Sequence, residues 1–424
     1  MRLVIDGRRL TSERTGVGRY LEGLLEEWAA SALPLAETLV VLNERGGLDR
    51  VPRVAGLRAE LIGERWPGLA WERWALASRL KPGDLLFAPA NLLPRSWRGP
   101  SVVVIHDVIQ EILPDSFPWH VRWRFARRYR RAAERADRVL VPSEATARDV
   151  ARVYAIAPER IRVIHPGPDP MFSPLTQQAD LVLEARRSLG LGQAPFFMFV
   201  GKRTSRRNIG SIANAFAQHR RAFPAHCLVF VGPPARDGTQ FTGQRDPGIL
   251  IAGHVAEHLL RGLLAGAVAL LYPSNYEGFG LPIVEAMASG CPVVTLRNSA
   301  LSEAGGDAAW YVDSAKPEAL AQAMRVLATD TACRADLVQR GLAHVARFSR
   351  AIFAERVRAE LRAVASSFQA ATRGEMHARE RVASARQCGP STGRGRESPA
   401  RRSRRAEGRP GAGCCDSARP ASRP

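Results

Sequence analysis

The sequence has 424 residues, more than one hydrophobic core usually supports, and its 46% of hydrophobic residues is ordinary for a globular chain. The formal net charge is +20; residues 373–424 carry +8 of it, from thirteen arginines and five acidic residues, so residues 1–372 keep +12. These values favour two basic globular domains, and the longest apolar stretch, residues 262–273, is too short to span a bilayer.

Short apolar runs alternate with helix-type segments in both halves of the chain. In the first half these runs are residues 3–5, 39–42, 85–87, 102–105 and 139–141, and the alternation resumes at residue 196. The pattern predicts an α/β fold with two doubly wound, Rossmann-like parallel sheets. Prolines 166, 168, 170 and 174 mark the boundary, because few regular elements run through such a cluster. We therefore expect domains at residues 1–165 and 166–345, facing one another across a cleft lined by strand-end loops.

Two strand-end loops of the first domain contain candidate ligand contacts. The first strand is followed by a loop with Gly16, Gly18 and Arg19 ahead of a helical segment. A Gly-x-Gly pattern is common before helices and is not specific by itself. The run 102–105 ends at His106, and a histidine at a strand end is most often structural or exposed.

Residues 117–135 combine aromatic side chains with six arginines between Arg122 and Arg131. Five residues at helical spacing form one apolar stripe, namely Val121, Phe125, Tyr129, Ala132 and Ala136. In one reading, this basic amphipathic helix lies on an anionic membrane surface. In the other, the stripe packs on the first domain and the arginines are solvated. Aromatic residues among arginines also suit nucleic acid, which we do not expect as a partner.

The second domain opens with a fully apolar strand, residues 196–200, and a basic loop. Gly201 ends the strand, and Lys202, Arg206 and Arg207 follow. Arginine can bind phosphate oxygens in a fork, although a solvated basic loop is the other reading. The sequence has no Asp-x-Asp pair and no His/Cys cluster with metal spacing, so we expect no metal site and no cofactor.

A glycine-rich turn between residues 273 and 294 leads from a short strand into a helical segment. Gly278 and Gly280 allow the backbone to approach a ligand closely, and the helix opening near Pro282 presents free N–H groups to an anion such as a diphosphate. Glu277 and Glu285 lie on either side of that place, where each carboxylate could accept hydrogen bonds from sugar or ribose hydroxyls. The other reading is an ordinary strand–turn–helix unit.

The chain ends in a helix and a basic tail. Phe353, Val357, Leu361 and Val364 recur at helical spacing, which predicts one amphipathic helix within residues 346–372. The tail, residues 373–424, has few large apolar residues and should be disordered. It could be a genuine tail or a translation artefact. Scattered cysteines and an opening strand without a leader pattern predict a cytoplasmic protein, at most peripheral on the inner membrane face.

The string from residue 273 to 294 resembles the signature of retaining glycosyltransferases of family 4, which have the two-domain GT-B architecture. The basic loop after residue 200 also matches, and the resemblance covers roughly residues 1–370. In the family, the last helix crosses back onto the first domain. The resemblance implies catalytic roles for His106 and Glu277 and donor-binding roles for Gly16, Lys202, Arg207, Gly253, His254, Val255, Gly278, Phe279, Gly280, Leu281 and Glu285.

The implied activity is metal-independent transfer of a hexose from a nucleotide diphospho-sugar to a glycan or lipid-linked glycan acceptor. The first-strand loop and the Gly201-Lys202-Arg203 segment are similar to mannosyltransferases of bacterial surface-polysaccharide assembly, which suggests GDP-mannose, with a UDP-hexose as the other donor. Residues 250–255 would read the base through backbone groups, so guanine and uracil stay open. The opposing class is a membrane- or nucleic-acid-binding protein on the same scaffold without transferase activity.

Overall fold

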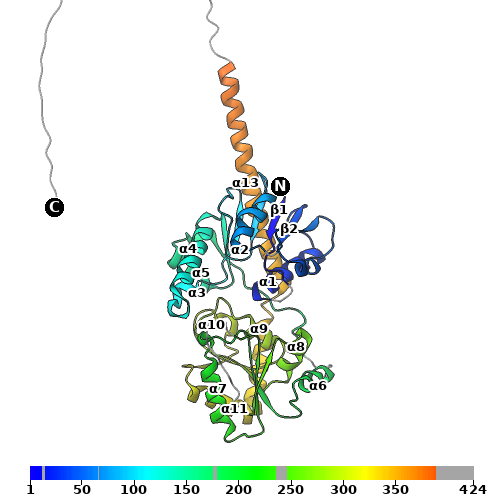
Figure 1. The fold of residues 1–424 in the computed structure, drawn as a ribbon, viewed down its shortest axis with the longest axis vertical. Helices are drawn as coiled ribbons and strands as arrows, with labels where there is room; N and C mark the ends of the chain where they lie inside the picture. Colours follow the sequence, from blue (N-terminus) through cyan, green and yellow to red (C-terminus); the bar gives the residue numbers. More distant parts are fainter. Residues whose placement is uncertain (12–14, 65, 175–178, 235–245, 388–424) are drawn as a thin grey trace, which may run out of the picture. The chain divides into compact units, whose positions relative to one another are not determined.

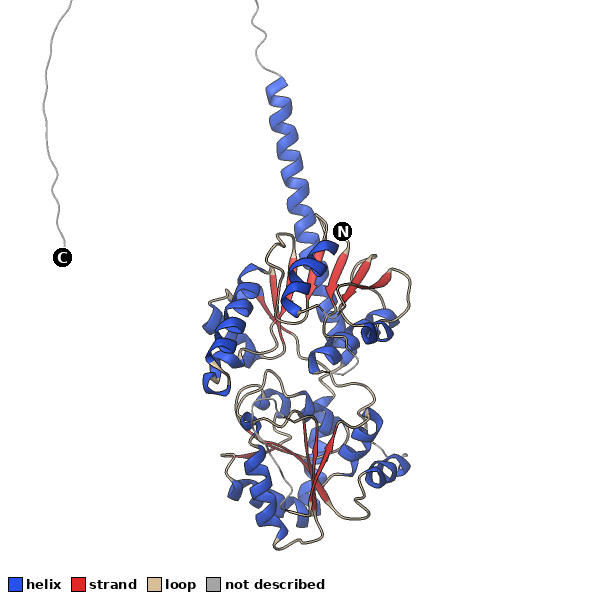
Figure 2. Ribbon diagram, in the orientation of Figure 1, coloured by secondary structure: helices blue, strands red, loops and turns tan. Residues whose placement is uncertain are grey.

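Two separate parallel sheets organise the chain, and each lies between layers of helices (Figures 1 and 2). The computed structural model describes residues 1–11, 15–64, 66–174, 179–234 and 246–387. Both sheets belong to one compact unit, Met1–Ala371. The predicted pair of doubly wound parallel sheets is therefore confirmed.

The first sheet has seven strands in the order β3-β2-β1-β4-β5-β6-β7. Its strands are β1 (Leu3–Asp6), β2 (Thr38–Leu42), β3 (Leu57–Leu61), β4 (Leu85–Ala88), β5 (Ser101–Val104), β6 (Arg138–Val141) and β7 (Ile161–Val163). Its helices are α1 (Gly16–Ala30), α2 (Gly68–Ala70), α3 (Ile109–Ile112), α4 (Trp119–Arg135) and α5 (Glu144–Tyr154). Short turns of helix complete it: η1 (Arg45–Arg50), η2 (Trp71–Leu76), η3 (Ala77–Arg79), η4 (Pro114–Ser116) and η5 (Pro158–Arg160).

Both faces of this sheet are buried, which explains why its strands are continuous apolar runs. Successive side chains of a strand point to opposite faces, so Leu3 and Ile5 enter one core while Val4 enters the other. The core that contains Leu3 also contains residues of α1 and the buried side chains Phe353 and Val357 from the start of the last helix. The Trp28 indole N–H donates to the carbonyl of Ala354 at 2.9 Å, which fixes the two helices together.

The second sheet has six strands in the order β10-β9-β8-β11-β12-β13. Its strands are β8 (Phe196–Val200), β9 (Cys227–Val231), β10 (Ile249–Gly253), β11 (Ala269–Tyr272), β12 (Val293–Leu296) and β13 (Trp310–Val312). Its helices are α6 (Ala179–Ser188), η6 (Ser205–Arg207), α7 (Ile209–Arg220), α8 (Glu257–Gly266), α9 (Leu281–Ala288), α10 (Leu301–Gly305), α11 (Pro317–Thr329) and α12 (Thr331–Val345). One apolar core joins both faces of this sheet to its helices.

The apolar stripe of α4 packs on the first sheet. Tyr129, Ala132 and Ala136 are buried in the core behind β4 to β6, and Phe125 packs against the same core. The apolar stripe therefore faces the first sheet and is not exposed to solvent. The arginines and two tryptophans lie on the other side.

The last helix, α13 (Arg350–Gln387), is longer than the predicted helix that ended at residue 372. Residues 373–387 are therefore helical and not irregular, because alanine, arginine and glutamate dominate this stretch and no proline occurs before residue 390. The remainder of the predicted tail, residues 388–424, lies outside the described residues.

Candidate active site

A cavity of about 570 Å³ is lined by residues of both domains, mainly from loops that follow strands of the two sheets. Ten of the thirteen residues assigned to the site from the sequence line this cavity. They are Gly16, His106, Lys202, Arg207, Glu277, Gly278, Phe279, Gly280, Leu281 and Glu285. The cavity thus brings together loops that are widely separated along the chain.

The turn after β11 needs both of its glycines. Gly280 has a φ of +107° and forms the N-cap of α9, a backbone conformation that costs glycine little. Gly278 lies against the first domain, and a side chain there would overlap the carbonyl oxygen of His106. The carbonyl of Gly278 accepts hydrogen bonds from the hydroxyls of Ser143, at 2.7 Å, and Thr146, at 2.9 Å. The glycine turn is therefore part of the contact between the two domains.

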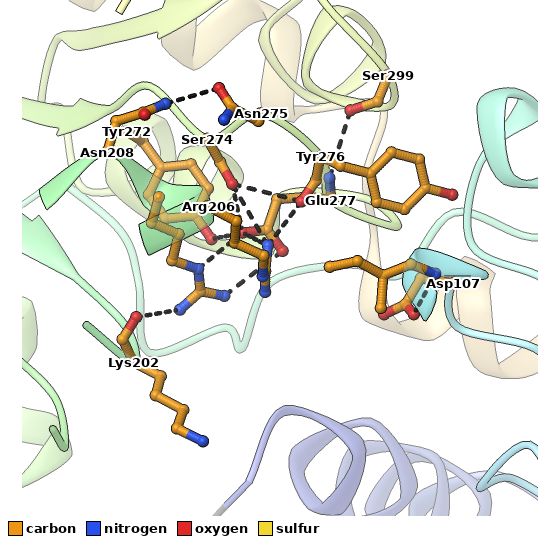
Figure 3. Close-up of polar contacts among 12 residues, drawn as sticks. Asp107, Lys202, Arg206, Asn208, Tyr272, Ser274, Asn275, Tyr276, Glu277 and Ser299 are labelled. Atoms are coloured by element: carbon orange, nitrogen blue, oxygen red, sulfur yellow. Dashed lines mark hydrogen bonds and ion pairs between the residues drawn. The ribbon is translucent and has the colours of Figure 1, made fainter. Parts of the chain in front are cut away.

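Glu277 is held by a convergent set of donors in the second domain (Figure 3). Its Oε1 accepts from Arg207 Nε at 2.8 Å, from the Tyr272 hydroxyl at 2.9 Å and from the Ser274 hydroxyl at 3.0 Å. Arg206 is also 2.8 Å from the same oxygen. Burial alone would raise the pKa of Glu277, but Arg207 and Arg206 outweigh it and lower the pKa to about 2. This carboxylate is therefore ionised at neutral pH and is a poor proton acceptor.

The basic loop after β8 uses its cations in different ways. Arg207 is committed to Glu277, and its guanidinium also donates to the Lys202 carbonyl at 3.2 Å. The Lys202 side chain is exposed and extends away from the Glu277 cluster (Figure 3). Within the described part of the chain, its ammonium has no ion-pair partner. Gly201, with a φ of +131°, makes room for Arg207, because a side chain there would overlap that guanidinium.

Glu285 is buried beneath the glycine turn and forms an ion pair with Arg19 from the N-terminal end of α1. Burial raises the pKa of Glu285, and Arg19 opposes this shift. Arg19 Nε is also 3.7 Å from Glu257 of α8, and its guanidinium lies over the Phe172 ring at 5.7 Å. Glu285, which was predicted to bind the donor, is therefore paired with a cation from the first domain.

His106 closes the first-domain side of the cavity. Its Nε2 is 2.7 Å from the Pro89 carbonyl, which can only accept, so Nε2 carries the proton and Nδ1 is left as an acceptor. Burial lowers the pKa of His106 to about 4, although the Pro89 hydrogen bond acts in the opposite direction. The Tyr20 ring meets the imidazole edge to face at 5.0 Å. A neutral imidazole at pH 7 can accept a hydrogen bond but cannot supply a positive charge.

The N-terminal end of α5 connects the domains beside the turn. Glu303 of α10 accepts from the backbone N–H groups of Glu144 and Ala145, both at 2.7 Å, and lies 3.2 Å from His165 Nε2. The Tyr276 hydroxyl, next to Glu277 in the chain, donates to Asp149 of α5 at 2.9 Å. Together with the Gly278 contacts, these bonds fix the position of the Glu277 loop relative to His106.

Three residues assigned to base recognition do not line the cavity. Gly253 is the last residue of β10, an edge strand of the second sheet, and His254 and Val255 follow it. The Gly253 carbonyl accepts from the Gly232 N–H at 2.6 Å, so this backbone group is used within the domain. The cavity instead reaches Pro233 after the neighbouring strand β9.

The structure gives a place in the site to four residues for which the sequence predicted no role there, although Arg19 and Arg206 lie in loops that it singled out. Arg206 and Tyr272 hold Glu277, Arg19 holds Glu285, and Asp107 lines the cavity beside His106. Arg206 could have been found from its place next to Arg207. The other contacts depend on tertiary packing, which residue spacing does not encode. Among the described residues, no group of three or more His, Cys, Asp or Glu side chains could hold a metal ion.

Family models match both halves of the chain. Residues 14–172 match a model described as Glycosyltransferase Family 4, and residues 194–330 match one described as Glycosyl transferases group 1. The chain is 25% identical over 372 residues to the O-antigen chain mannosyltransferase B of Escherichia coli, covering 82% of this chain and 96% of that protein. It is 24% identical over 340 residues to the serotype-specific mannosyltransferase WbdA of Escherichia coli, covering 73% and 40%.

Solved structures with the same fold include HepE of Anabaena in complex with UDP and glucose, with a TM-score of 0.67 and 18% identity, covering 85% of this chain and 99% of that one. WaaG, a glycosyltransferase involved in lipopolysaccharide biosynthesis, gives a TM-score of 0.66 and 16% identity, covering 85% and 99%. None of the helices described for this chain is long and apolar enough to cross a membrane. The two family models, the sequence relatives and the shared fold establish that the chain is a hexosyltransferase that belongs to the group 1, family 4 glycosyltransferases of the GT-B fold.

Proposed function

We propose that this glycosyltransferase moves mannose from GDP-mannose to a glycan or lipid-linked glycan acceptor, with retention of the anomeric configuration and without a metal ion. The general activity, sugar transfer from a nucleotide sugar, follows from the family. Mannose is supported by two relatives that are named mannosyltransferases, at 25% and 24% identity.

The fixed, ionised Glu277 is the observation that carries the proposal. The side chains of Arg207, Tyr272, Ser274 and Arg206 converge on it, and its lowered pKa makes it a poor general base at neutral pH. A carboxylate of this kind can accept hydrogen bonds from sugar hydroxyls and can stabilise positive charge that develops at the anomeric carbon. His106 would face the sugar from the first domain and accept one further hydroxyl hydrogen bond.

The proton of the acceptor hydroxyl then needs another destination. We infer that an oxygen of the departing diphosphate takes it, on the same face of the sugar as the bond that breaks. Lys202 and the N–H groups at the start of α9 would stabilise the charge on that diphosphate. Arg207 contributes indirectly, because it holds Glu277 in place.

Arg19 and Glu285 suggest how the donor enters. If Glu285 binds the ribose hydroxyls, the donor must displace Arg19 from that carboxylate. The displaced guanidinium would then lie beside the glycine turn, where the diphosphate is expected. After the exchange, the ribose hydroxyls would donate hydrogen bonds to the buried Glu285 carboxylate, and the diphosphate would compensate the charge of the partly exposed Arg19.

A donor panel tests the proposal. Purified protein is incubated with GDP-mannose, UDP-glucose and related nucleotide sugars, and the measurements are hydrolysis, transfer and thermal stabilisation. We expect GDP-mannose to be preferred, and a donor at 100 times its dissociation constant should stabilise the protein by about 2.7 kcal/mol. EDTA should leave the rate unchanged. Preference for a UDP-hexose would contradict the donor assignment, and activity lost in EDTA and restored by magnesium would contradict the metal-free mechanism.

The alternative of a binding protein without transferase activity receives no support from the family assignment. The arginine-rich segment that suggested this alternative still has no role in the proposed activity. None of its arginines lines the cavity of about 570 Å³, which we call the donor cavity.

A further inference from the structure

A second hollow, which we call the arginine–tryptophan groove, lies on the first domain. It has a volume of about 740 Å³ and is formed by residues 67–74 together with α4 and Arg95. None of its lining residues lines the donor cavity. Six arginines contribute to it, namely Arg73, Arg95, Arg124, Arg127, Arg128 and Arg131.

A buried ion network builds the groove. Glu72 is the one acidic residue in the described lining. It forms ion pairs with Arg128 of α4, at 2.5 Å, and with Arg8, which follows β1, at 3.1 Å. Arg8 in turn pairs with the buried Asp6. These contacts tie the 67–74 segment to α4 and to the sheet. They also neutralise the only negative charge among the lining residues that the structure describes.

The other five groove arginines have no acidic partner within the described ranges. Arg73, Arg95, Arg124 and Arg127 are exposed and Arg131 is half-buried. Several guanidinium groups around one hollow repel each other, so the groove has a positive potential that an anion would relieve. Charge complementarity therefore favours a partner that presents many negative groups.

Exposed tryptophans accompany these arginines. Trp74 is 58% exposed and Trp123 is 59% exposed, and both line the groove. Trp119, at 76%, lies one helical turn before Trp123. Arg73 lies over the Trp74 ring at 5.3 Å and Arg127 over the Trp123 ring at 5.2 Å. Tryptophan rings beside cations are typical of the interface between lipid headgroups and acyl chains, because the ring has an apolar body and a polar N–H.

The exposure of the tryptophan rings does not result from a missing core beneath them. The apolar stripe of α4 already packs on the first sheet, and Trp71, three residues before Trp74, is completely buried with its N–H bonded to the Ile62 carbonyl at 2.7 Å. Trp74 and Trp123 are thus surplus to the core. Three of the ten exposed large hydrophobic side chains in the described chain line this groove, namely Leu69, Trp74 and Trp123.

We propose that the arginine–tryptophan groove docks the protein on the surface of a bilayer that contains anionic phospholipids. The arginines bind headgroup phosphates while Trp74 and Trp123 enter the interfacial layer. Polyanionic nucleic acid would match the charges, but the rings are spread over two elements around a hollow instead of forming a track along a strand of bases. This inference does not depend on the donor or on the chemistry of the cavity.

Vesicle sedimentation of the full chain tests the proposal. The vesicles contain phosphatidylcholine alone or phosphatidylcholine mixed with phosphatidylglycerol. One variant combines Arg73→Gln, Arg124→Gln and Arg127→Gln, and a second combines Trp74→Ala and Trp123→Ala. The matched control changes three exposed arginines elsewhere, Arg53, Arg187 and Arg221, to Gln. Arg128 stays unchanged because it supports Glu72.

We expect the wild type to bind only the anionic vesicles. The groove arginine variant should bind the anionic vesicles on the order of a hundredfold more weakly, since each of its three arginines near the surface contributes about fivefold to the affinity. The tryptophan variant should lose about tenfold, and the control should change less than twofold. Equal losses in the control and groove variants would overturn the proposal in favour of net charge. Binding to neutral vesicles, or binding to single-stranded DNA but not to anionic vesicles, would overturn it as well.

Discussion

The donor cavity and the arginine–tryptophan groove are both rich in arginine, but they treat its charge in opposite ways. In the cavity, Arg207 and Arg206 surround Glu277, and Arg19 pairs with Glu285. In the groove, the one carboxylate, Glu72, pairs with Arg128 and Arg8, and the other five arginines have no acidic partner among the described residues.

Paired and unpaired arginines therefore indicate different tasks. A pair with a buried carboxylate fixes the position and the protonation state of that carboxylate, which is what a reacting site needs. An exposed, unpaired group keeps its charge available for a partner with weak geometric demands, such as a layer of phosphates. Substitutions in the cavity should thus change catalysis, and substitutions in the groove should change where the protein resides.

The largest effect is expected at Glu277. Replacing it with Gln keeps the shape but removes the charge, so turnover should fall by about a hundredfold or more, equivalent to about 2.7–4 kcal/mol of transition-state stabilisation. Glu277→Ala should lower turnover at least as far and should also lower the melting temperature, because Arg206 and Arg207 lose their shared partner. Steady-state kinetics with a thermal melt of each variant checks both. A Gln variant with near-normal turnover would disprove the role of the charge.

Lys202 should come next. It is one of three lysines in the sequence, it lines the cavity, and its ammonium has no ion-pair partner among the described residues. Lys202→Ala should weaken GDP binding by roughly ten- to a hundredfold, the range for one charge-assisted hydrogen bond. Lys316→Ala is the matched control, since Lys316 is exposed on the second domain away from the cavity. Calorimetric titration of GDP gives the answer, and equal affinities for the two variants would remove Lys202 from the site.

Substitution of Arg19 separates two possible roles of its ion pair with Glu285. If the guanidinium moves to the diphosphate when the donor binds, Arg19→Ala should weaken GDP binding about tenfold. If Arg19 only blocks Glu285, the same change should tighten binding. We expect the weaker binding, with partial recovery in Arg19→Lys, because an ammonium keeps the charge but not the fork. Tighter binding in Arg19→Ala would contradict the exchange.

The smallest effect concerns stability in acid. The pKa of His106 is lowered from 6.5 to about 4, so below pH 6.5 the unfolded chain binds a proton that the folded chain refuses. Stability is therefore lost as the pH falls from 6.5 towards 4, by at most about 2 kcal/mol between pH 6.5 and 5. Urea unfolding of His106→Gln at both values should show a smaller loss than the wild type. An identical loss would mean that His106 titrates normally.

The fold and most of the cavity could be predicted from the sequence. Buried parallel strands are continuous apolar runs, and the turn around Gly278 and Gly280 has a recognisable spacing. Strand β3 was missed because this edge strand mixes Arg58 and Glu60 with apolar residues. The end of α13 was missed because its last turns are helical without an apolar stripe that would mark them.

The electrostatic partners could not be predicted. Arg19 meets Glu285 only because the two domains meet, and the Tyr272 hydroxyl reaches Glu277 from a strand whose residues read as core. The residues 253–255, for which the resemblance implies base recognition, lie outside the lining of the cavity. The groove could not be predicted either. The sequence showed the arginines of α4, but no pattern in residues 67–74 indicated that this segment completes the groove.

One paired measurement tests the separation of the two arginine-rich sites most directly. GDP affinity by calorimetry and binding to phosphatidylglycerol-containing vesicles by sedimentation are determined for the wild type, for Lys202→Ala, and for the combined Arg73→Gln, Arg124→Gln and Arg127→Gln variant. We predict that Lys202→Ala loses GDP affinity and keeps vesicle binding, while the groove variant keeps GDP affinity and loses vesicle binding. Parallel losses of both activities in either variant would contradict two sites with separate tasks.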